Sequence, residues 1–175
     1  MIALILLSWL IIICFVIATI ETQSNGFFLQ KRIGQYGKLF SIIKIRTIHP
    51  KTHEVTSFGR YFRELKLDEL PQFFNVLKGD MSIVGPRPDV PGYYDLLQGE
   101  NREILSLKPG ITSDASLKYK NEDEILRCQE KPIEYNDQVI FPDKVKMNLA
   151  YVRNRTILGD LNIIMKTIFS FFNRN

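Results

Sequence analysis

The adjacent carboxylates Asp68 and Glu69 are the side chains of this sequence best suited to chemistry. They follow the basic residue Arg63, and a glycine-proline turn with Arg87 comes after them. The same pair has an ordinary structural interpretation, because an aspartate often caps a helix and a glutamate suits its first turn. Pro71, shortly after the pair, also fits the start of a helix. A catalytic role therefore depends on what surrounds the pair.

The surroundings favour chemistry on phosphate. A carboxylate at the N-terminus of a helix stays ionised, as a nucleophile must, because it lies at the positive end of the helix dipole. The same helix end, together with Arg63 and Arg87, could hold phosphate oxygens. Glu69 would offer Mg²⁺ a hard oxygen ligand, and an attack by Asp68 on phosphorus would give an acyl phosphate. Spacing in the sequence does not by itself bring these groups together.

The charge of the chain is unevenly distributed. The chain has 175 residues and a formal net charge of +4. Residues 31–66 hold nine Lys or Arg against two Glu, whereas residues 121–137 hold six acidic residues against two basic ones. A basic half beside an acidic segment indicates a surface that meets anions, either phosphates or lipid headgroups.

The few cysteines and histidines argue against a disulfide-stapled protein and against a zinc-binding one. Cys14 lies in an apolar run and Cys128 in a distant charged stretch, so a disulfide framework is not expected. His49 and His53 are the only histidines, and no zinc-ligand spacing is present. A chain of this length is sufficient for one domain with its own core.

The N-terminal run is almost wholly apolar, interrupted only by Ser8 and Thr19. Its length suits a helix that crosses about 30 Å of hydrocarbon. No basic residue precedes the run and no small-residue cleavage site follows it, so we expect a membrane helix over residues 1–21 rather than a secretory signal. Basic residues begin at Lys31, which places residues 22–175 on the cytoplasmic side. Because the run lacks proline, the residues alone favour a simple span over a helix that breaks and returns.

The rest of the chain predicts a small α/β domain that is mainly α. Two β-prone runs flank the turn signal Gly34-Gln35-Tyr36-Gly37 and suggest a short β-hairpin. Helices are expected next, followed by a short strand that ends at the Gly85-Pro86-Arg87-Pro88 turn. The expected elements are strands over 27–33 and 39–47, helices over 58–65 and 68–77, and a strand over 81–84.

The second half is expected to be helical apart from one extended piece. The expected segments are one or two helices over 92–107, an extended piece over 115–119, and helices over 122–130 and 142–154. Residues 157–173 form a last, amphipathic helix with an apolar face. Such a face suits packing on the core, and it also suits an interfacial helix that lies among lipid headgroups.

Several motifs together carry a resemblance to a known family. They are Leu67-Asp68-Glu69-Leu70-Pro71-Gln72 with its continuation to Pro88, Gln30-Lys31-Arg32-Ile33-Gly34, Lys44-Ile45-Arg46-Thr47 and Lys108-Pro109-Gly110-Ile111-Thr112. In these motifs the chain resembles the bacterial sugar transferases known as monotopic phosphoglycosyl transferases, and in particular a shorter branch of that family. The resemblance runs from the apolar helix to the C-terminal helix, and the central motif is too long to match by chance.

The resemblance implies a reaction and its central residues. Asp68 looks like the nucleophile that takes a phosphosugar from a UDP-sugar and releases UMP, through a covalent aspartyl-phosphosugar intermediate. Glu69 looks like its partner, a ligand for Mg²⁺ that also helps to activate the acceptor. The acceptor would be a polyprenyl phosphate, in bacteria usually undecaprenyl phosphate. The product would start the assembly of O-antigen, capsule, exopolysaccharide or glycoprotein glycans.

The resemblance also implies a set of phosphate-binding cations. Lys44, Arg63 and Arg87 stand where family members place basic residues around the phosphate-binding cleft. Lys120 stands where many members have an arginine assigned to phosphate. A lysine keeps the charge but loses the bidentate fork, so we expect looser recognition at Lys120.

The family fold implies a different N-terminal topology from the one that the residues alone favour. The family that this chain resembles has a helix–break–helix hairpin on one side of the bacterial inner (cytoplasmic) membrane. Its catalytic domain lies on the cytoplasmic face. Family members usually have Ser-Pro at the break, where this chain has Ser8-Trp9. We adopt the re-entrant helix as the expectation, beside the simple span.

Two other functional classes fit parts of the sequence. A catalytically inactive membrane scaffold of the same fold would explain the altered break, but not the intact Asp68-Glu69 pair. A nucleic-acid-binding module could use the cations of residues 31–66, yet these are interleaved with apolar residues and follow an apolar anchor, which fits membrane lipids better. The expected partners are therefore a UDP-sugar donor, a polyprenyl phosphate acceptor and membrane lipids, with no nucleic acid.

Overall fold

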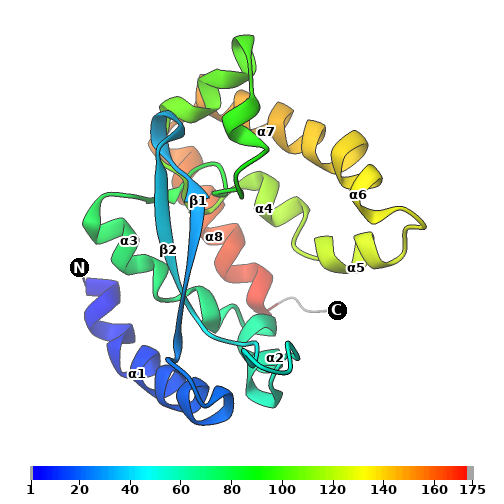
Figure 1. Cartoon of the computed structure of the whole chain (residues 1–175). Helices are drawn as coiled ribbons and strands as arrows, with labels where there is room; N and C mark the ends of the chain where they lie inside the picture. Colours follow the sequence, from blue (N-terminus) through cyan, green and yellow to red (C-terminus); the bar gives the residue numbers. More distant parts are fainter. Residues whose placement is uncertain (1, 173–175) are drawn as a thin grey trace. The chain divides into compact units, whose positions relative to one another are not determined.

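The computed structural model describes residues 2–172 (Figure 1), with side chains placed for residues 7–170. The chain forms two compact units. The first unit combines the N-terminal segment up to Arg32 with Leu39–Met81. The second combines Ile33–Lys38 with the chain from Ser82 onward. Each unit has a hydrophobic cluster of its own.

The first unit is built from a β-hairpin and helices. Its elements are α1 (Ile2–Thr22), β1 (Phe27–Ile33), β2 (Leu39–Ile45), α2 (Ser57–Glu64), the 3-10 turn η2 (Leu67–Glu69) and α3 (Gln72–Lys78). β1 pairs with β2, which confirms the predicted hairpin. The connection is the 3-10 turn η1 (Gln35–Gly37), where Tyr36 (φ 59°) and Gly37 (φ 78°) are left-handed, as tight hairpin turns require.

The core of the first unit lies where α1 packs on β2 and α2. Its buried members are Cys14, Ala18, Ile45 and Phe62. The buried positions of α1 recur every three or four residues, which is the period of one helix face. They are Ile11, Cys14, Ala18 and Thr22, and the exposed apolar positions of α1 are Trp9, Ile12, Ile13, Val16 and Ile20.

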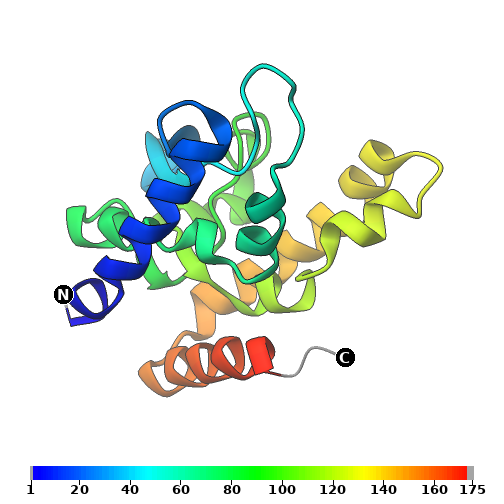
Figure 2. The ribbon, with the colours of Figure 1, turned by 90° about the horizontal axis from the view of Figure 1, so that it is seen from below.

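α1 is a single helix that continues through Ser8 and Trp9 (Figure 2). The break that the family resemblance implies at this point is therefore not seen in α1. No proline is present to remove a backbone N–H, so nothing in the sequence opens the helical hydrogen-bond ladder there. Among the residues that the structure describes, no helix is both long and apolar enough to cross a membrane.

The helix predicted over residues 68–77 begins later than expected. Lys66 has a left-handed backbone (φ 54°), η2 follows as one 3-10 turn, and α3 begins only after Pro71. A proline has no N–H to donate, so it suits the start of a helix but not its interior. α3 ends at Gly79 (φ 88°), which confirms the predicted stop.

The second unit is mainly helical and contains one short parallel strand pair. Its elements are β3 (Ser82–Val84), η3 (Tyr94–Leu96), η4 (Gly99–Ser106), β4 (Gly110–Thr112), α4 (Asp114–Lys118), α5 (Glu122–Arg127), α6 (Pro132–Tyr135), the π-helix η5 (Asn136–Ile140), α7 (Phe141–Asn154) and α8 (Ile157–Phe172). β3 runs parallel to β4, with Val84 opposite Thr112. Gly85 and Gly110 lie so close that a Cβ on either would collide with neighbouring backbone.

The predictions for the second unit hold for its longer helices and fail for one segment. The extended piece predicted over residues 115–119 is wrong, because this segment belongs largely to α4. Ser113 Oγ accepts a hydrogen bond from Ser116 N (3.0 Å), so a serine cap starts a helix there. The helices expected over 92–107 are the 3-10 helices η3 and η4. The strand β3 and the helices α5, α7 and α8 are confirmed, and the predicted end of α8 at residue 173 lies outside the described residues.

The core of the second unit lies where α7 packs on η4. Ile104, Leu105 and Val145 are buried there together with Tyr94. The hydroxyl of Tyr94 is bound by Asn148 Nδ2 at 2.7 Å, so the one polar group in this cluster is satisfied.

Candidate active site

Asp68 and Glu69 are buried within the first unit, with exposed fractions of 8% and 9%. They lie in η2, between the left-handed Lys66 and Pro71. α3 has Pro71 at its N-cap position and no side-chain cap bond. Asp68 therefore does not cap α3, so the predicted capping role is wrong.

The carboxyl group of Asp68 has an unsatisfied oxygen. Its Oδ1 is buried and has no hydrogen-bond partner among the described residues. Leaving a buried polar atom unpaired costs about 1–3 kcal/mol, and more if the group is charged. An unpaired buried group of this kind points to a catalytic role or to a bound ion.

The protonation of Asp68 depends on five nearby influences. Burial, followed by the negative charge of Glu69, raises the pKa of Asp68 to about 6. The positive charges of Lys44, Lys66 and Arg63 act against this rise in pKa. The sequence predicts a carboxylate kept ionised by a helix dipole. In the structure, ionisation near neutral pH depends instead on these three cations.

Lys44 reaches the carboxylates from β2. Its Nζ lies 3.3 Å from Glu69 Oε1, and both side chains are largely buried. Opposite charges at this depth persist only where their attraction offsets the cost of removing them from water. Lys44 therefore neutralises Glu69 and also lowers the pKa of Asp68.

Arg63 is held by Thr47, a residue to which the sequence assigns no role. Arg63 Nε donates to Thr47 Oγ1 (2.8 Å), and Thr47 is buried just after β2. The carbonyl of Thr47 accepts from Thr56 N (3.0 Å), at the start of α2. A Cβ on Gly59 would collide with the same carbonyl, so α2 lies directly against this residue. In the sequence, the only indication of this role of Thr47 was its hydroxyl, at the end of the basic motif Lys44-Ile45-Arg46-Thr47.

Arg46, the other cation of that motif, holds the hairpin instead. Its Nε donates to Asn25 O (2.8 Å) and its Nη2 to Phe27 O (3.3 Å). The guanidinium also lies over the Phe28 ring, 5.5 Å from its centroid. Lys44 on β2 and Arg46 just after β2 thus have different tasks.

Arg87 and Lys120 belong to the second unit. Arg87 is exposed in the turn after β3, where Gly110 N donates to Pro86 O (2.9 Å) and holds the backbone. Lys120 is exposed between α4 and α5. The predicted site residues that the first unit brings together are Lys44, Arg63, Asp68 and Glu69.

The donor set of η2 suits magnesium. Proteins bind Mg²⁺ through one or two carboxylates, and waters and substrate phosphates complete the coordination. Asp68 and Glu69 supply two adjacent carboxylates, and Asp68 Oδ1 is unpaired. Across the described residues, no group of three or more His, Cys, Asp or Glu side chains forms a metal site. Waters or substrate phosphates would complete the coordination of an ion bound here.

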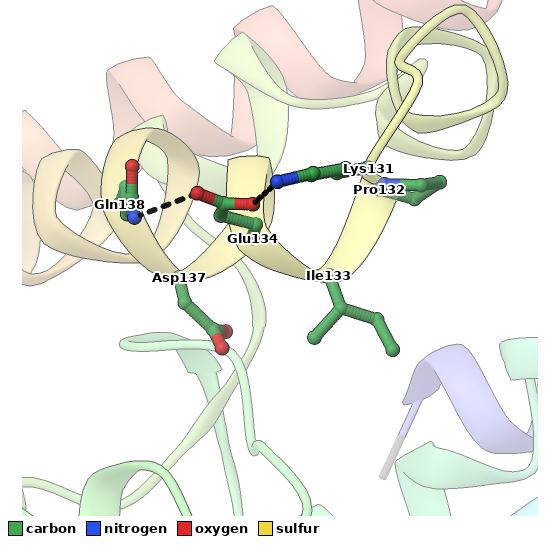
Figure 3. A pocket seen from close by; sticks show the side chains of 6 residues that line it. All are labelled: Lys131, Pro132, Ile133, Glu134, Asp137 and Gln138. Carbon is green, nitrogen blue, oxygen red and sulfur yellow. Dashed lines mark hydrogen bonds and ion pairs between the residues drawn. The ribbon is translucent and has the colours of Figure 1, made fainter.

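A shallow pocket in the second unit is not a rival site. Its lining residues are Lys131, Pro132, Ile133, Glu134, Asp137 and Gln138, from the start of α6 to η5 (Figure 3). Glu134 lies 3.0 Å from Lys131 Nζ and accepts from Gln138 Nε2 (3.3 Å). These two contacts are the i,i+3 and i,i+4 pairs of an ordinary helix surface. Asp137 Oδ1 accepts from Tyr93 OH (3.1 Å), a residue that does not line the pocket.

Comparisons with known proteins cover nearly the whole chain. The sequence profile of the bacterial sugar transferase family matches residues 1–174. A UDP-glucose:undecaprenyl-phosphate glucose-1-phosphate transferase of Klebsiella pneumoniae is 37% identical over 180 residues, which cover 91% of this chain and 36% of the relative. The uncharacterized sugar transferase EpsL of Bacillus subtilis (strain 168) is 34% identical over 170 residues, 90% of this chain and 76% of its own.

A third relative acts on a different sugar. The UDP-N-acetylgalactosamine-undecaprenyl-phosphate N-acetylgalactosaminephosphotransferase of Aeromonas hydrophila is 32% identical over 184 residues. The match covers 95% of this chain and 40% of that relative. The chain thus spans well under half of the length of the two relatives with named substrates, and about three quarters of the length of EpsL.

Proposed function

Because the chain belongs to the bacterial sugar transferase family, we propose that it transfers a sugar-1-phosphate from a UDP-sugar to polyprenyl phosphate. In bacteria the acceptor would be undecaprenyl phosphate, and the product would start the assembly of a glycan. The observation that carries the proposal is the buried Asp68-Glu69 pair, in which Asp68 keeps an unpaired oxygen beside the cations Lys44 and Arg63.

The proposed reaction has two displacement steps at one phosphorus atom. A carboxylate oxygen of Asp68 attacks the phosphate that carries the sugar, and the bond from this phosphorus to the oxygen of UMP breaks. UMP leaves with the electron pair of that bond. A phosphate oxygen of the polyprenyl acceptor then attacks the same phosphorus, and the Asp68 carboxylate leaves. The products are UMP and a polyprenyl diphosphate sugar, and Asp68 is regenerated.

The neighbours of Asp68 have distinct parts in this reaction. Lys44 and Arg63 keep Asp68 ionised and offset the negative charge of the diphosphate. Glu69 would hold Mg²⁺ and help to activate the acceptor phosphate. When bound, Mg²⁺ would neutralise charge on the transferred phosphate and on the departing UMP. Arg87 and Lys120 are proposed to bind phosphate oxygens, Arg87 through its fork and Lys120 as a point charge.

We propose that the protein works at the cytoplasmic face of the bacterial inner membrane, where α1 enters the lipid. The exposed apolar side chains of α1 support this proposal, and α8 has a similar exposed set. The exposed set of α8 comprises Ile157, Leu158, Leu161, Met165, Ile168 and Phe169. Residues 1–21 would then be the membrane-inserted part and residues 22–175 the catalytic part, with an amphipathic helix at 157–173.

The decisive test of the reaction is UMP release. The full chain in detergent is supplied with Mg²⁺, a polyprenyl phosphate and a panel of UDP-sugars, and wild type is compared with Asp68→Asn. We expect release by the wild type with at least one donor and none above background by Asp68→Asn. The matched control is Asp160→Asn in the second unit, because an amide oxygen can still accept from Tyr151 OH there.

Two results would oppose the proposal. Equal activity of Asp68→Asn would show that this carboxylate is not the nucleophile. A folded wild type that releases no UMP from any donor would favour the inactive scaffold of the same fold.

The membrane proposal has its own test. The double variant Ile12→Glu/Val16→Glu places charges on the exposed face of α1, whereas Leu96→Glu/Ile133→Glu places them on exposed apolar residues of the second unit. We expect only the α1 variant to lose co-flotation with vesicles of anionic phospholipid, because burying a charge in lipid is costly. Equal flotation of both variants would contradict a membrane role for α1.

A further inference from the structure

A buried amide connects α3 to the hairpin. Asn75 lies on α3 and is 1% exposed. Its Nδ2 donates to Ser41 O (2.8 Å) and its Oδ1 accepts from Ile43 N (3.1 Å), both on β2. In a strand, the C=O of one residue and the N–H two residues later point to the same edge. The amide of Asn75 thus binds the edge of β2 that β1 leaves open.

The backbone of Asn75 is bound as well as its side chain. Its carbonyl accepts from Asp80 N (2.9 Å) and from Met81 N (3.2 Å), after the end of α3. α3 cannot slide along β2 or rotate without breaking hydrogen bonds of buried groups, and each such loss is costly. Asn75 therefore sets the register of α3 against β2.

The two segments that Asn75 joins carry the partners of the candidate site. Lys44 directly follows Ile43 on β2, and Glu69 lies in η2, just before α3. The 3.3 Å contact between Lys44 Nζ and Glu69 Oε1 joins the same two segments. A slip of β2 by one residue would turn Lys44 to the opposite face of the strand.

We infer that Asn75 is a positioning residue, which holds Lys44 of β2 against the Asp68-Glu69 pair. The inference rests on the proposed function for its kinetic test, and Asn75 acts through Lys44 without touching substrate. The charged groups that influence Asp68 are Lys44 on β2, Glu69 and Lys66 at η2, and Arg63 on α2. Of these groups, Lys44 is the one whose backbone adjoins the bonds made by Asn75.

The experiment compares two buried amides in the full chain. Asn75→Ala removes the amide on β2, and Asn148→Ala removes an amide that is 3% exposed and binds Tyr94 in the second unit. kcat/KM for UMP release is measured near neutral pH and referred to the amount of folded protein. We expect Asn75→Ala to lower kcat/KM by roughly 10- to 100-fold, as for a catalytic group displaced by about 1 Å.

Asn148→Ala distinguishes positioning from a general loss of stability. With Lys44 displaced from Glu69, Asn75→Ala loses kcat/KM per folded molecule, whereas Asn148→Ala is expected to keep the value of the wild type. The same loss in both variants would overturn the inference.

A double-mutant cycle gives an independent answer. If Asn75 acts through Lys44, Asn75→Ala lowers kcat/KM much less in a Lys44→Met background than in the wild type. Equal losses in both backgrounds would assign Asn75 a merely structural role. Asn75→Asp, which keeps the shape and the acceptor for Ile43 N, replaces Asn75→Ala if that variant does not fold. Failure of both variants to fold would also count against positioning.

An NMR measurement separates this inference from the proposed function. In protein labelled with ¹³C-lysine, the Lys44 Cε resonance is assigned by its loss in Lys44→Met. A changed Lys44 Cε chemical shift in Asn75→Ala, but not in Asn148→Ala, supports positioning even if the wild type releases no UMP, which would oppose only the proposed function. An unchanged Lys44 Cε chemical shift in Asn75→Ala would overturn the inference while the transferase activity stands.

Discussion

Lys44 in the first unit and Lys144 in the second have the same side-chain exposure, 17%, but they pair with glutamate in different ways. Lys144 Nζ lies 2.7 and 2.6 Å from the two carboxylate oxygens of Glu122, and also near the Tyr119 ring. Lys44 Nζ lies 3.3 Å from Glu69 Oε1, and the adjacent Asp68 keeps an unpaired oxygen. The second unit thus holds a closed pair, Lys144 with Glu122. The first unit holds an open cluster, formed by Lys44, Glu69 and Asp68.

This difference shows that burial of a charge does not by itself indicate function. Lys144 on α7 and Glu122 on α5 satisfy each other, so their pair is adequately explained as a salt bridge within the second unit. Asp68 and Glu69 place two negative charges side by side, and repulsion between them contributes to the raised pKa of Asp68. A charge that its own fold leaves unsatisfied is the better indicator of a site for a ligand.

The largest expected effect comes from removing the charge of Asp68. Asp68→Asn should reduce UMP release by roughly 10⁴-fold or more, as loss of a nucleophile does. The same variant should be more stable than the wild type at pH 7.5, because it removes a buried carboxylate without a partner for Oδ1. Urea unfolding of both proteins in detergent measures this gain.

The stability of the wild type should also depend on pH through Asp68. Its pKa is raised from 3.8 to about 6 on folding, which corresponds to a cost of about 3 kcal/mol once both states are ionised. Between pH 4 and 6 the unfolded chain loses this proton first, so stability falls as pH rises and levels off above about 6. The stability of Asp68→Asn should not fall in this pH range. If its unfolding free energy had the same pH dependence as that of the wild type, the raised pKa of Asp68 would be contradicted.

The next largest effect is expected from breaking each lysine pair. Lys44→Met and Lys144→Met each remove the lysine partner of a partly buried glutamate, and we expect each to cost roughly 2–3 kcal/mol of unfolding free energy. Only Lys44→Met should move the acidic limb of kcat/KM to higher pH, because only Lys44 lowers the pKa of Asp68. A shift of the acidic limb of kcat/KM in Lys144→Met as well would mean that the two lysine–glutamate pairs do not differ in their effect on catalysis.

A smaller effect is expected at Thr47. Thr47→Val keeps the shape of the side chain but removes the acceptor for Arg63 Nε, at a cost of about 1 kcal/mol. We expect a few-fold rise in the KM for the UDP-sugar, since Arg63 is no longer oriented. Thr47→Ser restores the hydroxyl and should restore the KM. If valine and serine behave alike, the hydrogen bond to Arg63 has no part in binding.

The smallest effect is expected at Lys120, an exposed cation outside the open cluster. Lys120→Arg adds a bidentate fork, and a modest decrease in the KM for the UDP-sugar is expected. Lys131→Arg, on the surface of the second unit, serves as the control. An unchanged KM in Lys120→Arg would show that the side chain at position 120 does not bind the phosphates of the UDP-sugar.

Local patterns predicted the elements that depend on local interactions. The turn signal from Gly34 to Gly37 predicted the hairpin, and apolar periodicity predicted α7 and α8. Elements set by competing signals were missed. The start of α4 depends on the hydroxyl of Ser113, and β4 is too short to show a period and exists through its pairing with β3.

The sequence named four residues that the first unit brings together, but not how their side chains are buried and paired. A resemblance in motifs placed Asp68, Glu69, Lys44 and Arg63 in one reaction, and the structure unites these four in the first unit. Thr47 and Asn75 carried no assigned role, because a hydroxyl or an amide in a motif does not show which backbone or side chain it will reach.

The sequence by itself determined the family, the two adjacent carboxylates and the basic residues around them, because these follow from residue types and their order. Only the tertiary structure decided that Asp68 is no helix cap, that its Oδ1 lacks a partner, and that Lys44 pairs with Glu69. Burial, pairing and pKa depend on the segments that fold around a group, and Lys44 lies on a strand far before η2 in the chain. Contacts between such distant segments leave no local pattern in the order of residues.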